Sequence, residues 1–318
     1  MYFPLQMFIY FQSIFNSFSP QSEKIRSITN GFIIAACFIL LLVIFLTIYI
    51  LVKFRAKTNK HEPKEITSNR KLEILMVTGP FILVLFFFFW SIKIMNAVLP
   101  ERHKETPDVV ITGHQWWWEI SYPSSKSITS NELHLPVGKK LLLQLNSADV
   151  IHSWWVPSLA GKMDMIPGTT NYLWMTLSKP GIYEGACSEF CGQQHAWMRI
   201  RVIGESPEDF NQWVIINARN ALPILDSKAL AGETLFKKAT CSSCHSIRGT
   251  DAKGIAGPDL THFASRKMIL GGILENNPKN VFDWLTDPQK IKPGAHMPRF
   301  IFNRDSISAL TAYLEQLK

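Results

Sequence analysis

The residues with the clearest chemical potential lie in one stretch, residues 187–198, which reads CSEFCGQQHAWM. It places two cysteines, a histidine and a methionine at the spacing C-x3-C-x3-H-x2-M. Thiolate and thioether sulfurs beside an imidazole suit copper better than magnesium or calcium. A structural zinc site more usually uses C-x2-C pairs and has no place for the methionine. The stretch therefore indicates a copper site, and the alternative is a disulfide between Cys187 and Cys191.

Three further motifs upstream support the copper interpretation. They are GHQW at 113–116, IHSWWVP at 151–157 and KMDMIPG at 162–168. Together with residues 187–198 they resemble the binuclear copper (CuA) domain of cytochrome c oxidase subunit II. The resemblance implies that two coppers share two bridging thiolates, that each takes one imidazole, and that two weak axial ligands complete the site. The implied ligands are Cys187, Cys191, His152, His195, Met198 and the backbone carbonyl of Glu189.

A second constellation lies near the C-terminus. Residues 241–245 read CSSCH, the signature of covalent c-type haem attachment through Cys241 and Cys244, with His245 as iron ligand. The accompanying motifs are GETLF at 232–236, GPDL at 257–260 and PGAHMP at 293–298. The segment 228–318 resembles a class I cytochrome c, which implies Met297 as sixth ligand, with His296 as the competitor. The Pro258 carbonyl is the expected acceptor for the free nitrogen of His245.

The cysteine usage and the charge fit these two centres. Four of the five cysteines form two short-spaced pairs and Cys37 stands alone in an apolar run, which is not the pattern of a disulfide framework. Residues 228–318 carry thirteen basic against eight acidic residues, net +5, and residues 101–227 carry ten against thirteen, net −3. These opposite charges predict a weak, salt-sensitive contact between the segments. No basic stripe accompanies a nucleic-acid motif, so nucleic acid is not an expected partner.

Two apolar runs precede the copper motifs. Gly31 to Val52 and Ile74 to Ile92 contain no charged residue and are long enough to cross a bilayer as helices. Pro80 is expected to kink the second helix without ending it. We therefore predict a transmembrane hairpin over residues 31–95.

The segments flanking this hairpin suggest its orientation. Residues 53–71 carry seven basic against two acidic residues, and the positive-inside rule places this linker in the cytoplasm. The N-terminus and everything after residue 100 are then expected on the outer side of a bacterial inner membrane. Residues 1–20 are aromatic and apolar but lack a basic start and an obvious small-x-small cleavage site, and we interpret residues 1–30 as an interfacial segment.

The remaining chain predicts a β domain followed by helices. From Val109 to Val202, short β-branched and aromatic runs alternate with Pro, Gly and Asn, which is typical of an all-β sandwich or barrel. The resemblance implies a cupredoxin-like Greek-key barrel over residues 101–205. Ser206 caps an expected helix reaching about Ala221, so that 206–227 form a helix and linker. An all-α cytochrome c domain follows, whose last helix, Arg304 to Leu317, should pack against residues 230–236.

The resemblance also implies roles for residues outside the ligand sets. Trp116 of the GHQW motif is expected at the surface over the copper, where it admits electrons, whereas Trp117 and Trp118 are expected to be packing residues. The Glu189 carboxylate is expected to reach a magnesium shared with subunit I. Glu73 is expected near the entrance of a proton path into subunit I, and a headgroup-level carboxylate is the alternative.

As a whole, the sequence resembles subunit II of a haem–copper oxidase with a fused cytochrome c domain, as in the caa-type bacterial enzymes. The resemblance implies electron flow from a donor to haem c, to CuA, and then to haem a of subunit I, where oxygen reduction and proton translocation take place. Implied partners are subunit I, other oxidase subunits, the lipid bilayer, and cytochrome c or another periplasmic donor. Asp149 corresponds to an acidic residue of the family that helps to dock cytochrome c. The alternative interpretation is a solvated surface carboxylate. The CuA subunit of a membrane nitric oxide reductase is the alternative.

Overall fold

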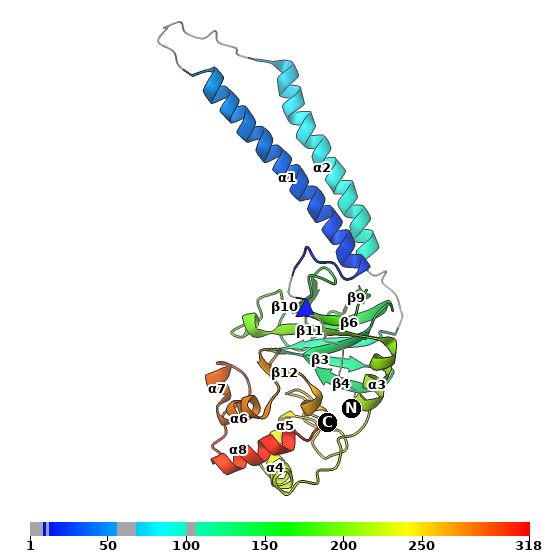
Figure 1. Ribbon diagram of the computed structural model, residues 1–318, viewed down its shortest axis with the longest axis vertical. Helices are drawn as coiled ribbons and strands as arrows, with labels where there is room; N and C mark the ends of the chain where they lie inside the picture. The colour runs from blue at the N-terminus through cyan, green and yellow to red at the C-terminus, as the bar shows by residue number, and fades with distance from the viewer. Residues whose placement is uncertain (1–8, 11–12, 56–67, 100–105) are drawn as a thin grey trace. The chain divides into compact units, whose positions relative to one another are not determined.

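The computed structural model describes residues 9–10, 13–55, 68–99 and 106–318. The chain divides into two compact units. One is Glu23–Leu99, and the other combines Met1–Ser22 with Pro100–Lys318. The first unit contains the apolar hairpin, and the second contains the β domain and the cytochrome-like domain (Figure 1).

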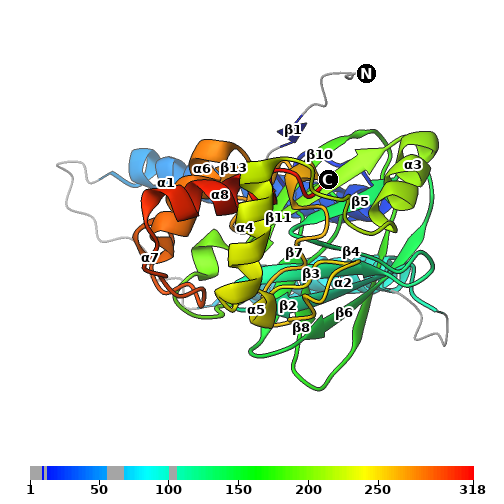
Figure 2. The same ribbon diagram turned by 90° about the horizontal axis from the view of Figure 1, so that it is seen from below.

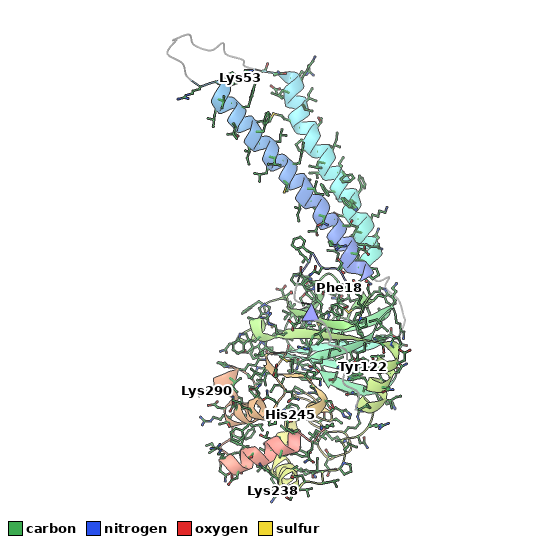
Figure 3. All side chains as sticks on the ribbon, in the orientation of Figure 1. Phe18, Lys53, Tyr122, Lys238, His245 and Lys290 are labelled. Carbon is green, nitrogen blue, oxygen red and sulfur yellow. The ribbon has the colours of Figure 1, made fainter. Side chains whose placement is uncertain are left out.

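Two long helices form the hairpin, α1 (Pro20–Lys53) and α2 (Arg70–Val98). Both are long and apolar enough to cross a membrane. Large apolar side chains are exposed along both helices (Figure 3), as expected for helices that face lipid. The helices approach closely at Gly31, where a Cβ atom would lie 2.6 Å from the ring of Trp90. The helix α2 continues through Pro80, as predicted.

Two sequence predictions for this region concern segments that are largely undescribed. The basic linker falls mostly on residues 56–67, and the interfacial segment includes residues 1–8 and 11–12, all outside the described residues.

Glu73 lies in the first turn of α2, where its Oε1 accepts a hydrogen bond from the Asn69 amide at 3.2 Å. Asn69 in turn caps the helix by accepting from the Leu72 amide. Glu73 therefore has a local structural role at the helix start.

The β domain is a sandwich of two mixed sheets (Figures 1 and 2). One sheet has the order β5-β11-β10-β7-β8 with β1 added beside β10, and the other has the order β4-β3-β2-β6-β9. The strands are β1 (Ile9–Tyr10), β2 (Val109–His114), β3 (Trp117–Tyr122), β4 (Ser127–Ser130), β5 (Glu132–Pro136), β6 (Leu141–Ser147), β7 (His152–Trp155), β8 (Met163–Met165), β9 (Asn171–Met175), β10 (Gly181–Cys187) and β11 (Arg199–Glu205). The expected cupredoxin-like β domain is confirmed.

The core of the sandwich explains why these segments form strands. Along β2 and β10, buried and half-buried residues alternate, so each strand presents one face to the core. Trp118 and Trp154 are fully buried and meet edge to face at 5.1 Å between ring centroids. Such aromatic pairs contribute stability beyond the area they bury. The strands that carry His152 and Cys187, β7 and β10, therefore belong to this tightly packed core.

The connecting helix α3 (Pro207–Asn217) begins as predicted, with Ser206 accepting from the Asp209 amide at 3.1 Å. It ends four residues before the expected Ala221, so that prediction was wrong. The reason is a competing set of partners: the Arg248 guanidinium donates to the Asn217 carbonyl at 3.1 Å, and the Ala221 amide donates to the Arg248 carbonyl at 3.0 Å. The chain after α3 is thereby held on the next domain.

The C-terminal domain is mainly helical, as predicted. Its elements are α4 (Ser227–Lys238), α5 (Cys241–Cys244), η2 (Phe263–Ser265), β12 (Met268–Ile269), β13 (Leu274–Glu275), α6 (Pro278–Thr286), α7 (Pro288–Ile291) and α8 (Arg304–Leu314). The expected packing of the first helix on the last is present, and α4 and α8 lie side by side in Figures 1 and 2. They cross at Gly232, where a Cβ atom would lie 2.0 Å from the Ala309 carbonyl oxygen. Only glycine permits this approach.

Candidate functional site

The copper-type residues converge at one end of the β sandwich. His152 starts β7, Cys187 ends β10, and η1 (His195–Trp197) leads to Met198 just before β11. The Cys187 and Cys191 sulfurs lie 3.8 Å apart and are free thiols, so the disulfide alternative is not present. The remaining separations are 3.9 Å from Cys187 Sγ to His152 Nδ1, 3.3 Å from Cys187 Sγ to Glu189 O, 3.6 Å from Cys191 Sγ to His195 Nδ1, and 3.8 Å from Cys191 Sγ to Met198 Sδ.

This donor set fits a soft metal. Cys187, Cys191, His152 and Met198 are buried, and ligand atoms of the first three lie within 4.8 Å of one another. Sulfur and imidazole donors at one point match the chemistry of copper better than that of a hard cation such as magnesium. In the described part of the chain, no other group of His, Cys, Asp or Glu side chains meets in this way.

The two thiols titrate as a pair. The Cys187 and Cys191 sulfurs share a hydrogen bond, which holds the pKa of Cys187 well below its usual range. The same shared proton, together with burial, raises the pKa of Cys191. The first proton is therefore lost readily and the second is retained, as expected when two like groups adjoin. A thiolate is the form that binds a metal.

Asp149 fixes the orientation of the buried imidazole. Its Oδ1 lies 2.8 Å from His152 Nε2, and its Oδ2 accepts from the Gln115 amide at 2.6 Å. Burial lowers the pKa of His152, but hydrogen bonds with Cys187 and Asp149 outweigh it and raise that pKa. With Nε2 on the carboxylate, Nδ1 is the ring nitrogen that faces the sulfurs. Asp149 thus supports the site directly.

Trp116 lies against the same loop, but not at the surface. Its indole Nε1 donates to the Cys191 carbonyl at 2.9 Å. Its exposed fraction is only 8%, so the expectation of a surface tryptophan was wrong. The cause is the C-terminal domain: the His296 ring packs on Trp116 at 5.0 Å between centroids, and Lys292 Nζ donates to its carbonyl at 3.2 Å. Trp118 is buried in the core, as predicted.

Two other residues of the loop have defined surroundings. Gly192 has φ +112°, and a Cβ atom there would lie 3.0 Å from Trp116 Cζ2, so both the backbone and the contact require glycine. The Glu189 carboxylate lies 3.8 Å from Lys162 Nζ in an exposed ion pair, whereas its backbone carbonyl lies 3.3 Å from Cys187 Sγ. The backbone carbonyl of Glu189 therefore contacts the cysteine cluster, whereas its side-chain carboxylate contacts an exposed lysine.

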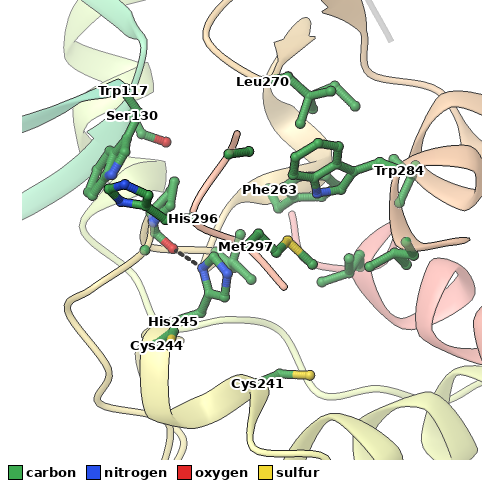
Figure 4. Close-up of a pocket in the computed structure, with 18 of the residues that line it drawn as sticks. Trp117, Ser130, Cys241, Cys244, His245, Phe263, Leu270, Trp284, His296 and Met297 are labelled. Atoms are coloured by element: carbon green, nitrogen blue, oxygen red, sulfur yellow. Dashed lines mark hydrogen bonds between the residues drawn. The ribbon is translucent and has the colours of Figure 1, made fainter. Parts of the chain in front are cut away.

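The haem-type residues surround a cavity of about 500 Å³ in the C-terminal domain (Figure 4). His245 and Met297 both extend into it, and Cys241 and Cys244 line its floor. His245 Nδ1 donates to the Pro258 carbonyl at 2.7 Å, as predicted, which leaves Nε2 with a lone pair. Burial lowers the pKa of His245. A Cβ atom at Gly257 would lie 2.6 Å from His245 Cε1, so glycine admits the ring.

Part of this cavity is built by the β domain, which the sequence did not indicate. The contributing residues are Gln115, Trp116, Trp117, Ser130 and Asn131. Trp117, interpreted as packing, is buried but also lines the cavity. These residues lie more than a hundred positions before CSSCH, and no local pattern marks them as haem neighbours. Volume, apolar lining and a free histidine nitrogen together fit a haem.

Comparisons with known proteins agree with these two centres. Family models match for cytochrome c oxidase subunit II, transmembrane domain (residues 4–94), cytochrome c oxidase subunit II, periplasmic domain (126–205) and cytochrome c (229–318). A cytochrome c oxidase subunit 2 of Alkalihalophilus pseudofirmus is 33% identical, over 94% of this chain and 89% of the relative. One of Bacillus sp. (strain PS3) is 34% identical, over 80% and 77%. The crystal structure of the periplasmic domain of subunit II of cytochrome oxidase of Bradyrhizobium japonicum is 32% identical, covering 36% of this chain and 96% of that one, with a TM-score of 0.34.

Proposed function

The chain belongs to the cytochrome c oxidase subunit II family, and we propose that it is the electron-entry subunit of a respiratory oxidase. Electrons would pass from a donor through haem c to CuA and on to haem a of subunit I. The observation that supports this most directly is the convergence of all six expected copper donors beside a cavity that the copper domain helps to enclose. When bound, the two groups supply reversible one-electron chemistry.

The copper ligands are proposed from the donors that converge. Cys187 and Cys191 would bridge through their thiolates, and His152 and His195 would each bind through Nδ1. The weak ligands would be Met198 Sδ and the Glu189 carbonyl. Strands β7, β10 and β11 hold these groups, and the hydrogen bond of Asp149 fixes one imidazole. A rigid donor set keeps reorganisation small when the site gains or loses an electron.

The haem ligands are proposed on the same basis. Cys241 and Cys244 would form the thioether bonds, His245 Nε2 would bind iron, and Met297 would be the sixth ligand. The competing His296 has its ring on Trp116, which favours Met297. Trp116 would then receive electrons from the haem domain rather than from a free donor, since little of its surface remains open.

The surroundings of the chain follow from the family. Membership implies a membrane-anchored subunit that associates with subunit I and other oxidase subunits. We propose a periplasmic location for the N-terminus and for residues after 100, and cytochrome c or another periplasmic protein as donor. Glu73 at the proton entrance and a magnesium on the Glu189 carboxylate complete the proposal. Glu73→Gln should lower turnover and proton uptake; unchanged values would leave Glu73 only its helix-capping contact.

The deciding experiment counts copper in the full-length protein. We expect two coppers per chain and the mixed-valence spectrum of a delocalised pair, and Cys191→Ser should abolish that spectrum. Cys37→Ser is the matched control, because Cys37 is exposed on α1, away from the site in sequence. Binding of a single zinc by the wild-type protein would contradict the proposal.

A further inference from the structure

Each of the two domains inserts one buried charge into the other. Glu132, on β5 of the copper domain, has an exposed fraction of 2%. Its carboxylate accepts hydrogen bonds from the backbone amides of Lys267 at 3.1 Å and of Met268 at 2.9 Å, both in the haem domain. A carboxylate without water is stable only where such donors meet it.

The reciprocal contact is made by Lys292, which follows α7 in the haem domain and is 5% exposed. Its Nζ donates to the carbonyl of Trp116 at 3.2 Å and to the carbonyl of Leu270 at 3.1 Å. Burial lowers the pKa of Lys292 to about 8. The ammonium has three N–H groups and the neutral amine has two, so either form can satisfy both carbonyls.

These contacts define one orientation of the domains. Hydrogen bonds to charged groups are directional and stronger than neutral ones. A small rotation would leave the Glu132 carboxylate without its two amide donors and Lys292 without the Trp116 carbonyl, which is costly for buried charges. The region they enclose contains the His296 ring on Trp116, and the indole of Trp116 donates to the Cys191 carbonyl. Beside it, the Gln194 side chain donates to the Pro293 carbonyl.

We propose that Glu132 and Lys292 are positioning residues that hold the haem domain on the copper domain in one fixed orientation. Electron transfer between the two centres then needs no docking step. The inference rests on the proposed function for its electron-transfer readout, whereas the fixed orientation can be tested separately. It replaces the weak, salt-sensitive contact expected from the opposite net charges, because hydrogen bonds buried from water are screened little by salt.

The test uses the full-length protein with both centres loaded. Rapid reduction of the haem followed optically gives the intramolecular rate, and pulsed electron–electron double resonance gives the haem-to-copper distance distribution. We expect the wild-type rate to be independent of solvent viscosity and of added salt, with a narrow distribution. Lys292→Met and Glu132→Gln should broaden it and slow transfer at least about tenfold, since small misplacements have large kinetic costs. Lys290→Met, at an exposed lysine of α7, should change neither.

The outcomes separate the two proposals. A wild-type rate that falls with viscosity, or a broad wild-type distribution, would overturn the fixed orientation and requires no variant. The same holds if both variants fold and transfer electrons like wild type with an unchanged distribution. If the wild-type haem does not reduce the copper centre at all while the distribution stays narrow, the proposed function fails and the fixed orientation stands.

Discussion

The two centres differ in how much of each is local in sequence. All copper-type donors except His152 come from residues 187–198, and strands anchor both segments. The haem-type residues lie in a wider arrangement: His245 and Met297 are more than fifty positions apart, and the copper domain supplies part of the cavity lining. A site whose donors touch the metal is compact and leaves a spacing signature. The lining of a cavity for a large cofactor depends on long-range packing, and the lining residues therefore have no characteristic spacing in the sequence, even though CSSCH marks the attachment point.

The cysteines of the two centres show the same contrast. Cys187 and Cys191 are buried and hydrogen-bonded, whereas Cys244 is exposed and Cys241 half-buried. Burial raises the pKa of Cys241, which favours its thiol form. Thiols that bind a metal ion can be buried by the fold. Thiols that form covalent bonds to a haem must be accessible to the haem when it attaches. The centres should therefore respond differently to loss of their cysteines.

The largest expected effect removes one centre and spares the other. Replacing both Cys241 and Cys244 by Ala should abolish covalent haem, measured as the haem stain on a denaturing gel. The copper spectrum should persist, because every proposed copper donor belongs to the sandwich and its loop. Loss of the copper spectrum in this variant would show that the copper site depends on the haem domain, and the contrast would then be wrong.

Substitutions at the adjacent residues Met297 and His296 should distinguish haem ligation from electron transfer to the copper centre. Met297→Leu should lower the haem reduction potential by roughly 0.1–0.2 V, since axial ligands set potentials over a wide range. His296→Leu is the matched variant: the potential should stay, while transfer to copper should slow because the contact with Trp116 is lost. Potentiometric titration decides the first and flash reduction the second. The reverse pattern would make His296 the ligand.

Asp149 tests how far the copper centre depends on its support. Asp149→Asn keeps the size but weakens the contacts with His152 Nε2 and the Gln115 amide. We expect copper affinity to fall about 10–100-fold, as for other hydrogen-bond partners of metal-bound imidazoles. Competition with a chelator measures it, and Glu208→Gln on the exposed face of α3 is the control. Unchanged affinity would return Asp149 to a role in docking a donor.

The same contrast explains what could be predicted from the sequence. Residue spacing, apolar runs and strand alternation are local, so the convergence of the copper-type residues, the hairpin and the β domain could all be predicted. The burial of Trp116 could not be predicted, because it depends on how the C-terminal domain packs against the β domain. Nothing local distinguishes buried Lys292 from exposed Lys290, or Glu132 from a surface acid on an edge strand. The end of α3 was missed for the same reason, since Arg248 lies thirty-one residues after Asn217.

The smallest expected effect concerns Glu189, whose two oxygen-bearing groups serve different surroundings. The carbonyl lies 3.3 Å from Cys187 Sγ, and the carboxylate forms an exposed contact with Lys162 at 3.8 Å. Glu189→Gln keeps the carbonyl, so the copper spectrum of the isolated subunit should be unchanged. Loss of one exposed ion pair should alter the free energy of unfolding by less than about 1 kcal/mol. In the complex with subunit I, the variant should lose the proposed magnesium, measured by metal analysis. A shifted copper spectrum would mean that the carboxylate reaches the copper centre, and retained magnesium would remove Glu189 from that second site.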